Sequence, residues 1–447
     1  MMDWNQLISN KRLGQEDLHY QKKDDRTEFH RDYDRLIFSS PFRRLQNKTQ
    51  VFPLPGSIFV HNRLTHSLEV ASVGRSLGDD VARRLSDKHP ELKDSHLSEC
   101  GSIVSAACLA HDMGNPPFGH SGERAIAAYF TEGAGQKYRE LVTPEQWKDL
   151  VLYEGNANAF RLLTHQFKGR RPGGFVMTYS TLASIVKYPY PAIYAGEKQK
   201  FGFFQSEIDT YRKIANELGI LQTNDNDSQP RFARYPLVYL VEAADDICYE
   251  IMDIEDAHKL KILTTKETQE LLINYFDEER QKSIKSVLEK VTDVNEQIVY
   301  LRSCCIGALE AACVDVFVKN EEAILNGTFK DSLVKHIEGR IGDAYKACEK
   351  TSYDHIYRSK DVVDIELAGY KIISTLIDLF TTAAMTPDGA YSKLLLERVS
   401  KQYEVIDEGE NNVYRRIMAV LDYISGMTDV YALDLFRKIN GESIPII

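Results

Sequence analysis

The residues with the clearest chemical potential are an adjacent histidine and aspartate, His111 and Asp112, which follow an apolar run and precede Gly114 and two prolines. Glycine and proline end helices, so the pair is predicted to lie at the last turn of a helix. Taken alone, a histidine beside an aspartate is more often a hydrogen-bonded structural pair than a metal site. Polar residues elsewhere in the chain favour the metal site.

Two other polar residues lie within apolar helical patterns. His66 shares a predicted helix face with Val70 and Leu77, and Asp245 lies in an apolar run that begins at Val241. A buried imidazole needs a polar partner, and an unpaired buried carboxylate is strongly disfavoured. One divalent metal ion would satisfy all of these groups, and its predicted ligands are His66, His111, Asp112 and Asp245.

The predicted ligand set limits the choice of metal. Two imidazoles and two carboxylates have borderline hardness, which suits Mn²⁺, Mg²⁺, Fe²⁺, Co²⁺ or Zn²⁺. Such a site keeps coordination positions open for water and substrate. We expect one divalent metal per subunit, Mn²⁺ or Mg²⁺ first, although the ligand set itself does not choose among these metals.

A second histidine and carboxylate pair follows the first. His120 and Glu123 are three residues apart at the start of the next predicted helix, so both lie on one face. The carboxylate can orient the imidazole and favour its protonated, charged form. His120 is therefore the candidate acid/base and Glu123 its partner. The alternative is structural, because the helix dipole alone favours a glutamate in the first turn.

The elements that must position these residues are predicted to be helices. Apolar residues recur three and four apart and no series of alternating strands is present, which indicates an all-α class. Predicted helices that carry or precede candidate residues span 41–50, 65–85, 98–112, 122–130, 156–164 and 237–253. Long amphipathic helices follow, including 299–318 and 365–384, and loops are predicted at 169–174 and 221–230.

These elements suggest three regions: a charged arm at 1–35, a core at 36–260, and a helical region at 261–447 that completes the site, forms an oligomer interface, or does both. The arm is expected to wrap the surface or a neighbouring subunit. The 447 residues are 43% hydrophobic and 27% charged, which is typical of a soluble globular protein. The net charge of −11 argues against broad adhesion to nucleic acid or membranes.

Localisation is predicted from the same composition. The amino terminus lacks a basic segment followed by an apolar one, no window approaches a membrane span, and the seven cysteines show no paired spacing. A cytoplasmic protein with reduced thiols is therefore expected.

Several sequence blocks resemble motifs of known enzyme families. The order H…HD…D on helices is similar to the HD phosphohydrolase superfamily. Five blocks together resemble the deoxyguanosinetriphosphate triphosphohydrolases: FRRLQNKTQVF (42–52), NRLTHS (62–67), HDMGNPPFGHSGE (111–123), YEGNA (153–157) and DDICY (245–249). They cover roughly residues 26–260, whereas the carboxy-terminal half resembles the family chiefly at IELAGY (365–370). The resemblance implies an HD-domain helical core with a long helical extension.

The resemblance also implies an activity. Members of this family hydrolyse a deoxynucleoside triphosphate, with dGTP favoured, to a deoxynucleoside and inorganic triphosphate. Attack at the α-phosphorus needs a metal to polarise the phosphate and an acid for the departing 5′-oxygen. The predicted metal ligands and the His120 and Glu123 pair supply both.

Substrate-binding residues are assigned by the same resemblance. Tyr249 and Asp253 follow Asp245 at intervals of four on one helix face. Tyr249 would pack against the deoxyribose, and Asp253 with Gln50 would bind the 3′-hydroxyl, although without the resemblance Tyr249 is an ordinary helix residue. The expected contacts to the triphosphate are Arg63 and Lys187, and a weaker candidate for base recognition is Glu366.

Other functions remain open at this stage. One alternative is another HD-type phosphohydrolase or phosphodiesterase that acts on monophosphates or cyclic nucleotides, and another is a nucleotide-sensing scaffold without turnover. Family members form homo-oligomers, often hexamers, and some respond to other dNTPs or single-stranded DNA. A basic run at 168–171 could contact nucleic acid, but a solvated loop is preferred.

Overall fold

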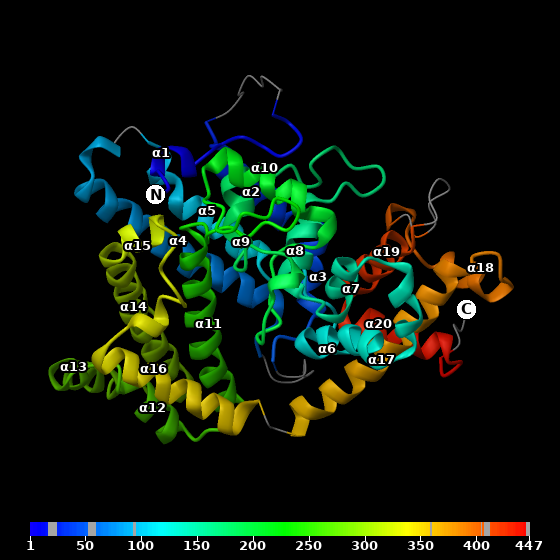
Figure 1. Ribbon diagram of the computed structural model, residues 1–447. Helices are drawn as coiled ribbons and strands as arrows, with labels where there is room; N and C mark the ends of the chain where they lie inside the picture. The colour runs from blue at the N-terminus through cyan, green and yellow to red at the C-terminus, as the bar shows by residue number, and fades with distance from the viewer. Residues whose placement is uncertain are drawn as a thin grey trace.

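The computed structural model describes residues 1–16, 25–51, 60–92, 95–357, 360–403, 405 and 412–443. Within these ranges the chain is built from helices, and its β-type pairing is limited to three isolated bridges. The predicted all-α class is confirmed (Figure 1).

The helices of the first half are α1 (Trp4–Leu7), α2 (Glu28–Ile37), α3 (Ser40–Arg44), α4 (Arg63–Lys88), α5 (Cys100–Ala110), α6 (Gly119–Thr131), α7 (Pro144–Val151), α8 (Gly155–Thr164), α9 (Tyr179–Ile185), α10 (Ile208–Leu218) and α11 (Val238–Lys259). Those of the second half are α12 (Thr265–Ile273), α13 (Glu278–Leu288), α14 (Val294–Lys319), α15 (Glu321–Leu325), α16 (Gly339–Thr351), α17 (Lys360–Met385), α18 (Ala390–Leu396), α19 (Val413–Ser425) and α20 (Asp429–Ile439). Short 3-10 turns join several of them.

Helices α4 and α5 cross closely because both carry glycine at the contact. A Cβ atom on Gly78 would lie 2.6 Å from the Cα of Gly101, and one on Gly74 would lie 2.6 Å from the Sγ of Cys108. A larger side chain at either glycine would force the helices apart. The close crossing brings the start of α4 beside the end of α5.

Two apolar clusters form the core of the described part of the chain. The first joins α4, α5, α9, α10 and α11 to α12, α14 and α16. The second joins α6 and α7 to α17, α18, α19 and α20, and Figure 1 shows these helices together on one side of α11, opposite α12 to α16. Residues 119–151, which belong to the predicted region 36–260, therefore pack with the carboxy-terminal helices.

The amino-terminal segment is attached to its own chain. Trp4 and Leu7 are buried in the first cluster, and the indole Nε1 of Trp4 donates a hydrogen bond to Glu321 (2.9 Å). The backbone N–H of Met2 donates to the carbonyl of Leu325 (2.8 Å). Part of the expected arm, 17–24, lies outside the described residues.

Helix ends differ from expectation by a few residues. The helix expected at 41–50 ends at Arg44 and continues as a 3-10 turn to Asn47, whereas α4 begins two residues earlier than predicted. Both predicted loops are confirmed. In the loop at 169–174, Arg170 lies over the rings of Phe167 and Phe175. No helix in the described part of the chain has the length and apolar character needed to span a bilayer.

Candidate active site

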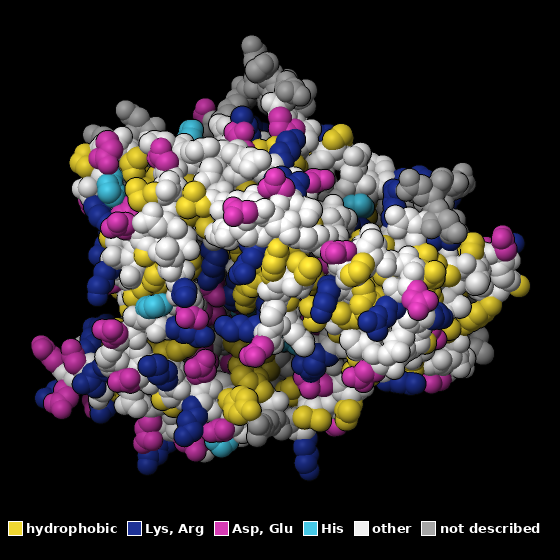
Figure 2. Space-filling model, viewed as in Figure 1, with side chains coloured by type: hydrophobic (Ala, Val, Ile, Leu, Met, Phe, Trp, Pro, Cys, Tyr) yellow, Lys and Arg dark blue, Asp and Glu magenta, His cyan; other side chains and the backbone are white. Residues whose placement is uncertain are grey.

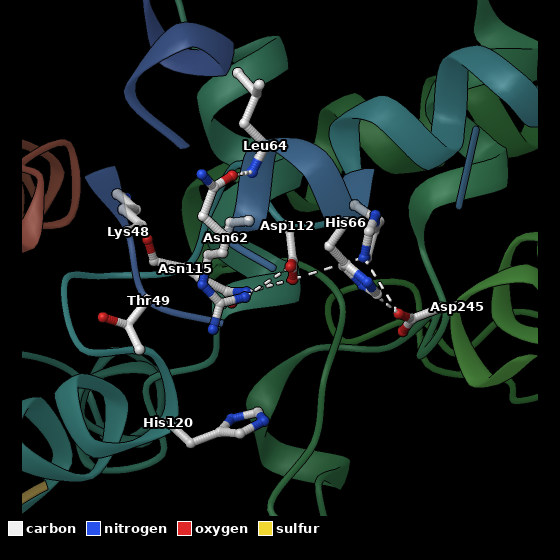
Figure 3. Close-up of polar contacts among 12 residues, drawn as sticks. Lys48, Thr49, Asn62, Leu64, His66, Asp112, Asn115, His120 and Asp245 are labelled. Atoms are coloured by element: carbon white, nitrogen blue, oxygen red, sulfur yellow. Dashed lines mark hydrogen bonds and ion pairs between the residues drawn. The ribbon is translucent and has the colours of Figure 1, made fainter. Parts of the chain in front are cut away.

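The four predicted metal ligands meet where α4, α5 and α11 converge. The Nε2 atom of His66 lies 3.0 Å from Oδ1 of Asp245, and Nε2 of His111 lies 3.4 Å from the same oxygen. The distance from Nε2 of His111 to Oδ1 of Asp112 is 3.7 Å. His66, His111 and Asp112 present ligand atoms within 4.8 Å of one another, and Figure 3 shows the side chains of His66, Asp112 and Asp245 converging.

Helix ends explain this convergence. Asn62 caps α4 by accepting hydrogen bonds from the backbone N–H groups of Leu64 and Thr65, both 3.0 Å, and so fixes the turn that carries His66. Helix α5 ends at Ala110, so His111 caps it and Asp112 lies just beyond. The pair was predicted within the last turn, but the following glycine and prolines end the helix before it.

His111 is oriented to present one nitrogen to the cluster. Its Nδ1 lies 2.6 Å from the carbonyl oxygen of Cys108, which is an acceptor only, so Nδ1 carries the proton. The buried Nε2 has no hydrogen-bond partner among the described residues. A buried nitrogen without a partner, aimed at two carboxylates, is the arrangement that a metal ligand requires.

The electrostatics of the cluster favour a cation. Burial opposes protonation of His111, but the charges of Asp112 and Asp245 outweigh it and raise the pKa of the imidazole to about 9. Burial likewise opposes ionisation of Asp245, yet the two histidines hold its pKa well below the usual range. Positive charge is thus stabilised between the carboxylates, whether it is carried by protons or by a metal ion.

Arg63 contacts a predicted metal ligand directly. Its Nη1 donates to Oδ2 of Asp112 at 2.6 Å, and the side chain is buried. The amide of Asn115 donates to the other oxygen of Asp112. Arg63 was expected on the triphosphate; it lines the cavity, but its guanidinium also fixes the orientation of the aspartate.

His120 and Glu123 form the predicted pair at the start of α6. The Nδ1 atom of His120 lies 3.0 Å from Oε2 of Glu123, and the imidazole is 67% exposed. Figure 3 shows His120 set apart from the ligands, facing them across an open space. The hydrogen bond to Glu123 raises the pKa of His120, so the imidazole holds its proton to a higher pH than an isolated histidine.

Glu123 is anchored from two sides. Its Oε1 accepts a hydrogen bond from the backbone N–H of Gly155 (2.8 Å), and the ammonium group of Lys200 lies 3.8 Å from Oε2. Burial raises the pKa of Glu123, but His120, Lys200 and the Gly155 N–H outweigh that effect and lower it overall. A Cβ atom on Gly155 would lie 2.5 Å from Oε1, so a side chain there would displace the carboxylate.

A cavity of about 410 Å³ connects the two groups. Among the predicted residues, those that line it are Gln50, Arg63, His111, Asp112, His120, Glu123, Lys187, Asp245 and Tyr249. Its carboxylates, which are Asp112, Glu123, Glu242, Asp245, Asp246, Glu250 and Glu349, outnumber its Lys and Arg side chains, which are Arg63, Lys187 and Lys200. Figure 2 shows this face hollowed beside α11, with Lys and Arg side chains at the rim.

The predicted sugar-binding residues lie on α11, but Asp253 is covered. The ring of Tyr249 lies 6.4 Å from that of His66 and stacks on Tyr357 at 6.0 Å. The hydroxyl of Tyr357 donates to Oδ2 of Asp253 (2.8 Å), and Asp253 is only 5% exposed. Burial raises the pKa of Asp253 well above its usual range. Gln50 faces the cavity with a buried Oε1 that has no hydrogen-bond partner among the described residues.

The structure does not bring Glu366 to the cavity that the described residues form. Its Oε1 pairs with Arg124 at 2.6 Å, its side chain is 45% exposed, and its carbonyl accepts from Ser121 (2.8 Å). Glu366 therefore joins α17 to α6 outside the cavity of this chain. Lys187 faces the cavity and pairs with Glu242 (3.0 Å), which outweighs burial and raises the pKa of the lysine.

Three groups near the site were missed from the sequence. Lys200 binds Glu154 (2.6 Å) beside Glu123, Tyr357 covers Asp253, and Asn115 holds Asp112. Asn115 follows the HD pair within three residues, so its position could have suggested the contact. Lys200 and Tyr357 lie far along the chain without a local pattern, and only the fold brings them to the site.

Two family models match this chain and define its class of protein. Residues 63–153 match the family model of the HD domain, and residues 336–438 match that of the phosphohydrolase-associated domain. The chain is therefore an HD-domain phosphohydrolase. Three of the four predicted metal ligands, His66, His111 and Asp112, lie within the HD match, whereas Asp245 lies beyond it on α11.

Relatives that align over nearly the whole chain identify its family within that class. A deoxyguanosinetriphosphate triphosphohydrolase-like protein of Pseudomonas aeruginosa (strain LESB58) is 37% identical over 99% of this chain and 100% of its own length. One from Synechocystis sp. is also 37% identical, with the same coverage. A deoxyguanosinetriphosphate triphosphohydrolase of Yersinia enterocolitica is 30% identical over 92% of this chain and 93% of its own. This chain belongs to the deoxyguanosinetriphosphate triphosphohydrolase-like family.

Proposed function

We propose that the chain is a metal-dependent triphosphohydrolase that converts a deoxynucleoside triphosphate, with dGTP favoured, to a deoxynucleoside and inorganic triphosphate. The observation that carries the proposal is one cavity lined by three of the four predicted metal ligands and by the His120 and Glu123 pair. The relatives named for this reaction support it over other HD-type chemistry.

The residues present fit a divalent metal ion. His66, His111, Asp112 and Asp245 would hold it, because the free Nε2 of His111 and the converging carboxylates supply a borderline-hard donor set. A bound divalent ion polarises a phosphate and lowers the pKa of water. The excess of carboxylates over cations in the cavity makes a polyanionic substrate unfavourable there without such an ion.

The His120 and Glu123 pair on α6 would supply the proton that the leaving group needs. Gly155, Lys200 and His120 lower the pKa of Glu123, and the hydrogen bond to Glu123 raises the pKa of His120, which favours the protonated imidazole. A protonated imidazole facing the ligands can donate its proton to the departing 5′-oxygen when the α-phosphorus is attacked. Glu123 orients the imidazole and does not itself need to reach the substrate.

The cavity also offers groups for the rest of the nucleotide. Arg63, Lys187 and Lys200 line it and would attract the phosphate oxygens. Tyr249 offers an aromatic face for the deoxyribose beside the ligands, and Gln50 offers an unpaired amide oxygen for its hydroxyl. A 3′-hydroxyl that binds Asp253 would compete with the hydroxyl of Tyr357.

The test is a substrate panel. Purified protein with Mn²⁺ or Mg²⁺ is incubated with each dNTP, with GTP, and with mono- and cyclic nucleotides, and the phosphate products are separated by anion-exchange chromatography. We expect inorganic triphosphate from dNTPs, most from dGTP, and none from the His66→Ala variant. Pyrophosphate or single phosphates from dNTPs, or turnover of monophosphates alone, would refute the proposal.

The family resemblance also supports a homo-oligomer and an effector. Mass photometry reports the oligomeric state, and a rate measured with a second dNTP or with single-stranded DNA reports the effector. We expect an assembly larger than a monomer, and a monomer at micromolar concentration would contradict that expectation.

A further inference from the structure

Asp429, the first residue of α20, binds two backbone segments of the active site at once. Its Oδ2 accepts a hydrogen bond from the N–H of Thr49 (2.8 Å), and its Oδ1 accepts one from the N–H of Phe118 (2.9 Å). The carboxylate is 7% exposed. It lies in the first turn of α20.

Each of these N–H groups lies within two residues of a predicted site residue. Thr49 precedes Gln50, and it also pairs with Asn62, the cap of α4. Figure 3 shows Thr49 near Lys48, to the left of the ligand cluster and of His120. The hydrogen bond from Thr49 therefore fixes the segment on which Gln50 enters the cavity.

The second N–H belongs to the turn that carries His120. Phe118 has a φ of 63° and is followed by Gly119 with a φ of 56°, so two consecutive residues are left-handed just before α6. This conformation is strained for phenylalanine and persists only when its surroundings hold it. The carboxylate of Asp429 supplies such a restraint two residues from His120.

Lys48 makes a second contact between the site and the carboxy-terminal helices. The buried ammonium of Lys48 donates to the carbonyl oxygens of Asn115 (2.5 Å) and Ser425 (2.8 Å), which joins the loop after Asp112 to the end of α19. Both contacts connect the residues matched by the HD domain, or those just before them, to the phosphohydrolase-associated domain. The carboxy-terminal helices are thereby tied to the backbone of the site.

We propose that Asp429 is a positioning residue, through which α20 holds the segments that carry Gln50 and His120 in register with the metal ligands. The inference rests on the proposed function where it concerns turnover. The two hydrogen bonds themselves can be tested without a substrate.

The test compares Asp429→Asn with Asp434→Asn, which makes the same change on the same helix at a residue that is 43% exposed and paired with Lys438. An asparagine amide accepts only one of the two N–H groups and turns a donor toward the other. We expect kcat for dGTP to fall about 10- to 100-fold in Asp429→Asn, because small displacements of an acid have effects of that size. KM should change less, Mn²⁺ affinity should be retained, and Asp434→Asn should resemble the wild type.

A double-mutant cycle separates positioning from general loss of structure. In the His120→Ala background, Asp429→Asn should cause a smaller further loss of the residual activity than in the wild type, because one of the two segments it holds acts through His120. An equal loss in both backgrounds would overturn the inference. If Asp429→Asn does not fold, the same comparison is made with Asp429→Glu, which keeps the carboxylate.

Hydrogen exchange gives a readout that needs no turnover. Peptides covering 45–51 and 114–121 should exchange faster in Asp429→Asn than in Asp434→Asn, with the rest of the chain unchanged. Unchanged exchange in both peptides would refute the positioning role. Faster exchange in a protein that hydrolyses no dNTP would instead refute the proposed function and leave the two hydrogen bonds established.

Discussion

At the scale of single residues, His111 shows how the cluster is prepared for a metal. The Cys108 carbonyl fixes the Nδ1 proton, which leaves Nε2 free toward Asp245. The sequence could predict this histidine because it follows an apolar helix and adjoins an aspartate. It could not predict that Arg63 would bind Asp112, because that contact depends on how α4 meets the end of α5.

Removing a ligand should separate metal binding from proton transfer. His111→Ala is expected to lower Mn²⁺ affinity by more than roughly 100-fold, since even supporting groups around a metal contribute ten- to 100-fold. His120→Ala should keep the metal and lose turnover, because His120 faces the ligands without joining them. Manganese retained after gel filtration, measured by atomic emission, checks both variants. Equal metal loss in the two would contradict this division of roles.

The pH dependence of turnover should report the bond between His120 and Glu123. Because Glu123 raises the pKa of His120, the imidazole keeps its proton to a higher pH than an unpaired histidine and loses it as the pH rises through the raised pKa. Glu123→Gln removes the charge, so the alkaline limb of kcat should move toward lower pH. The profile of Glu132→Gln, an exposed residue at the end of α6, should match that of the wild type. An alkaline limb that does not move in Glu123→Gln would exclude His120 as the acid.

At the scale of elements, helix type and order were predictable and helix contacts were not. The apolar periods around Val70 and Val241 identified α4 and α11, and the glycine and prolines after Asp112 identified the end of α5. The pairing of α6 with α17 had no signal in the sequence. It depends on packing such as that of Gly369, where a Cβ atom would lie 2.6 Å from the Cβ of Phe118.

A buried ion cluster joins α8 to α19. Arg161 is 3% exposed, and its guanidinium binds Asp422 through Nε and Nη2 and Glu207 through Nη1 (2.7 Å). Arg161→Ala leaves two buried carboxylates without their cation, which should lower the free energy of unfolding by about 3–5 kcal/mol.

Urea denaturation at neutral pH measures this loss. Arg83→Ala is the control, because Arg83 is 69% exposed in its pair with Asp80, and a surface pair contributes less than about 1 kcal/mol. If the two variants unfold at the same urea concentration, the cluster does not stabilise the contact between α8 and α19.

At the scale of the whole molecule, the site lies between two apolar cores. The predicted metal ligands lie on or just beyond helices of the first core, whereas His120 lies in the first turn of α6, which packs in the second. The sequence divided the chain near residue 260, because helical patterns with chemical motifs end there. That boundary stays a prediction. Asp429 contacts Thr49 and Lys48 contacts Ser425, so helices α19 and α20 border the segments that carry the site, and the expectation that the carboxy-terminal region completes the site stays a prediction.

The central claim is that a metal site and an acid act on the α-phosphorus of a dNTP. Turnover of dGTP in water enriched in oxygen-18 tests it most directly, with ³¹P nuclear magnetic resonance and mass spectrometry of both products. The account predicts one labelled oxygen on a terminal phosphorus of inorganic triphosphate and none in deoxyguanosine. Label in a single phosphate, in pyrophosphate or in the nucleoside would contradict it.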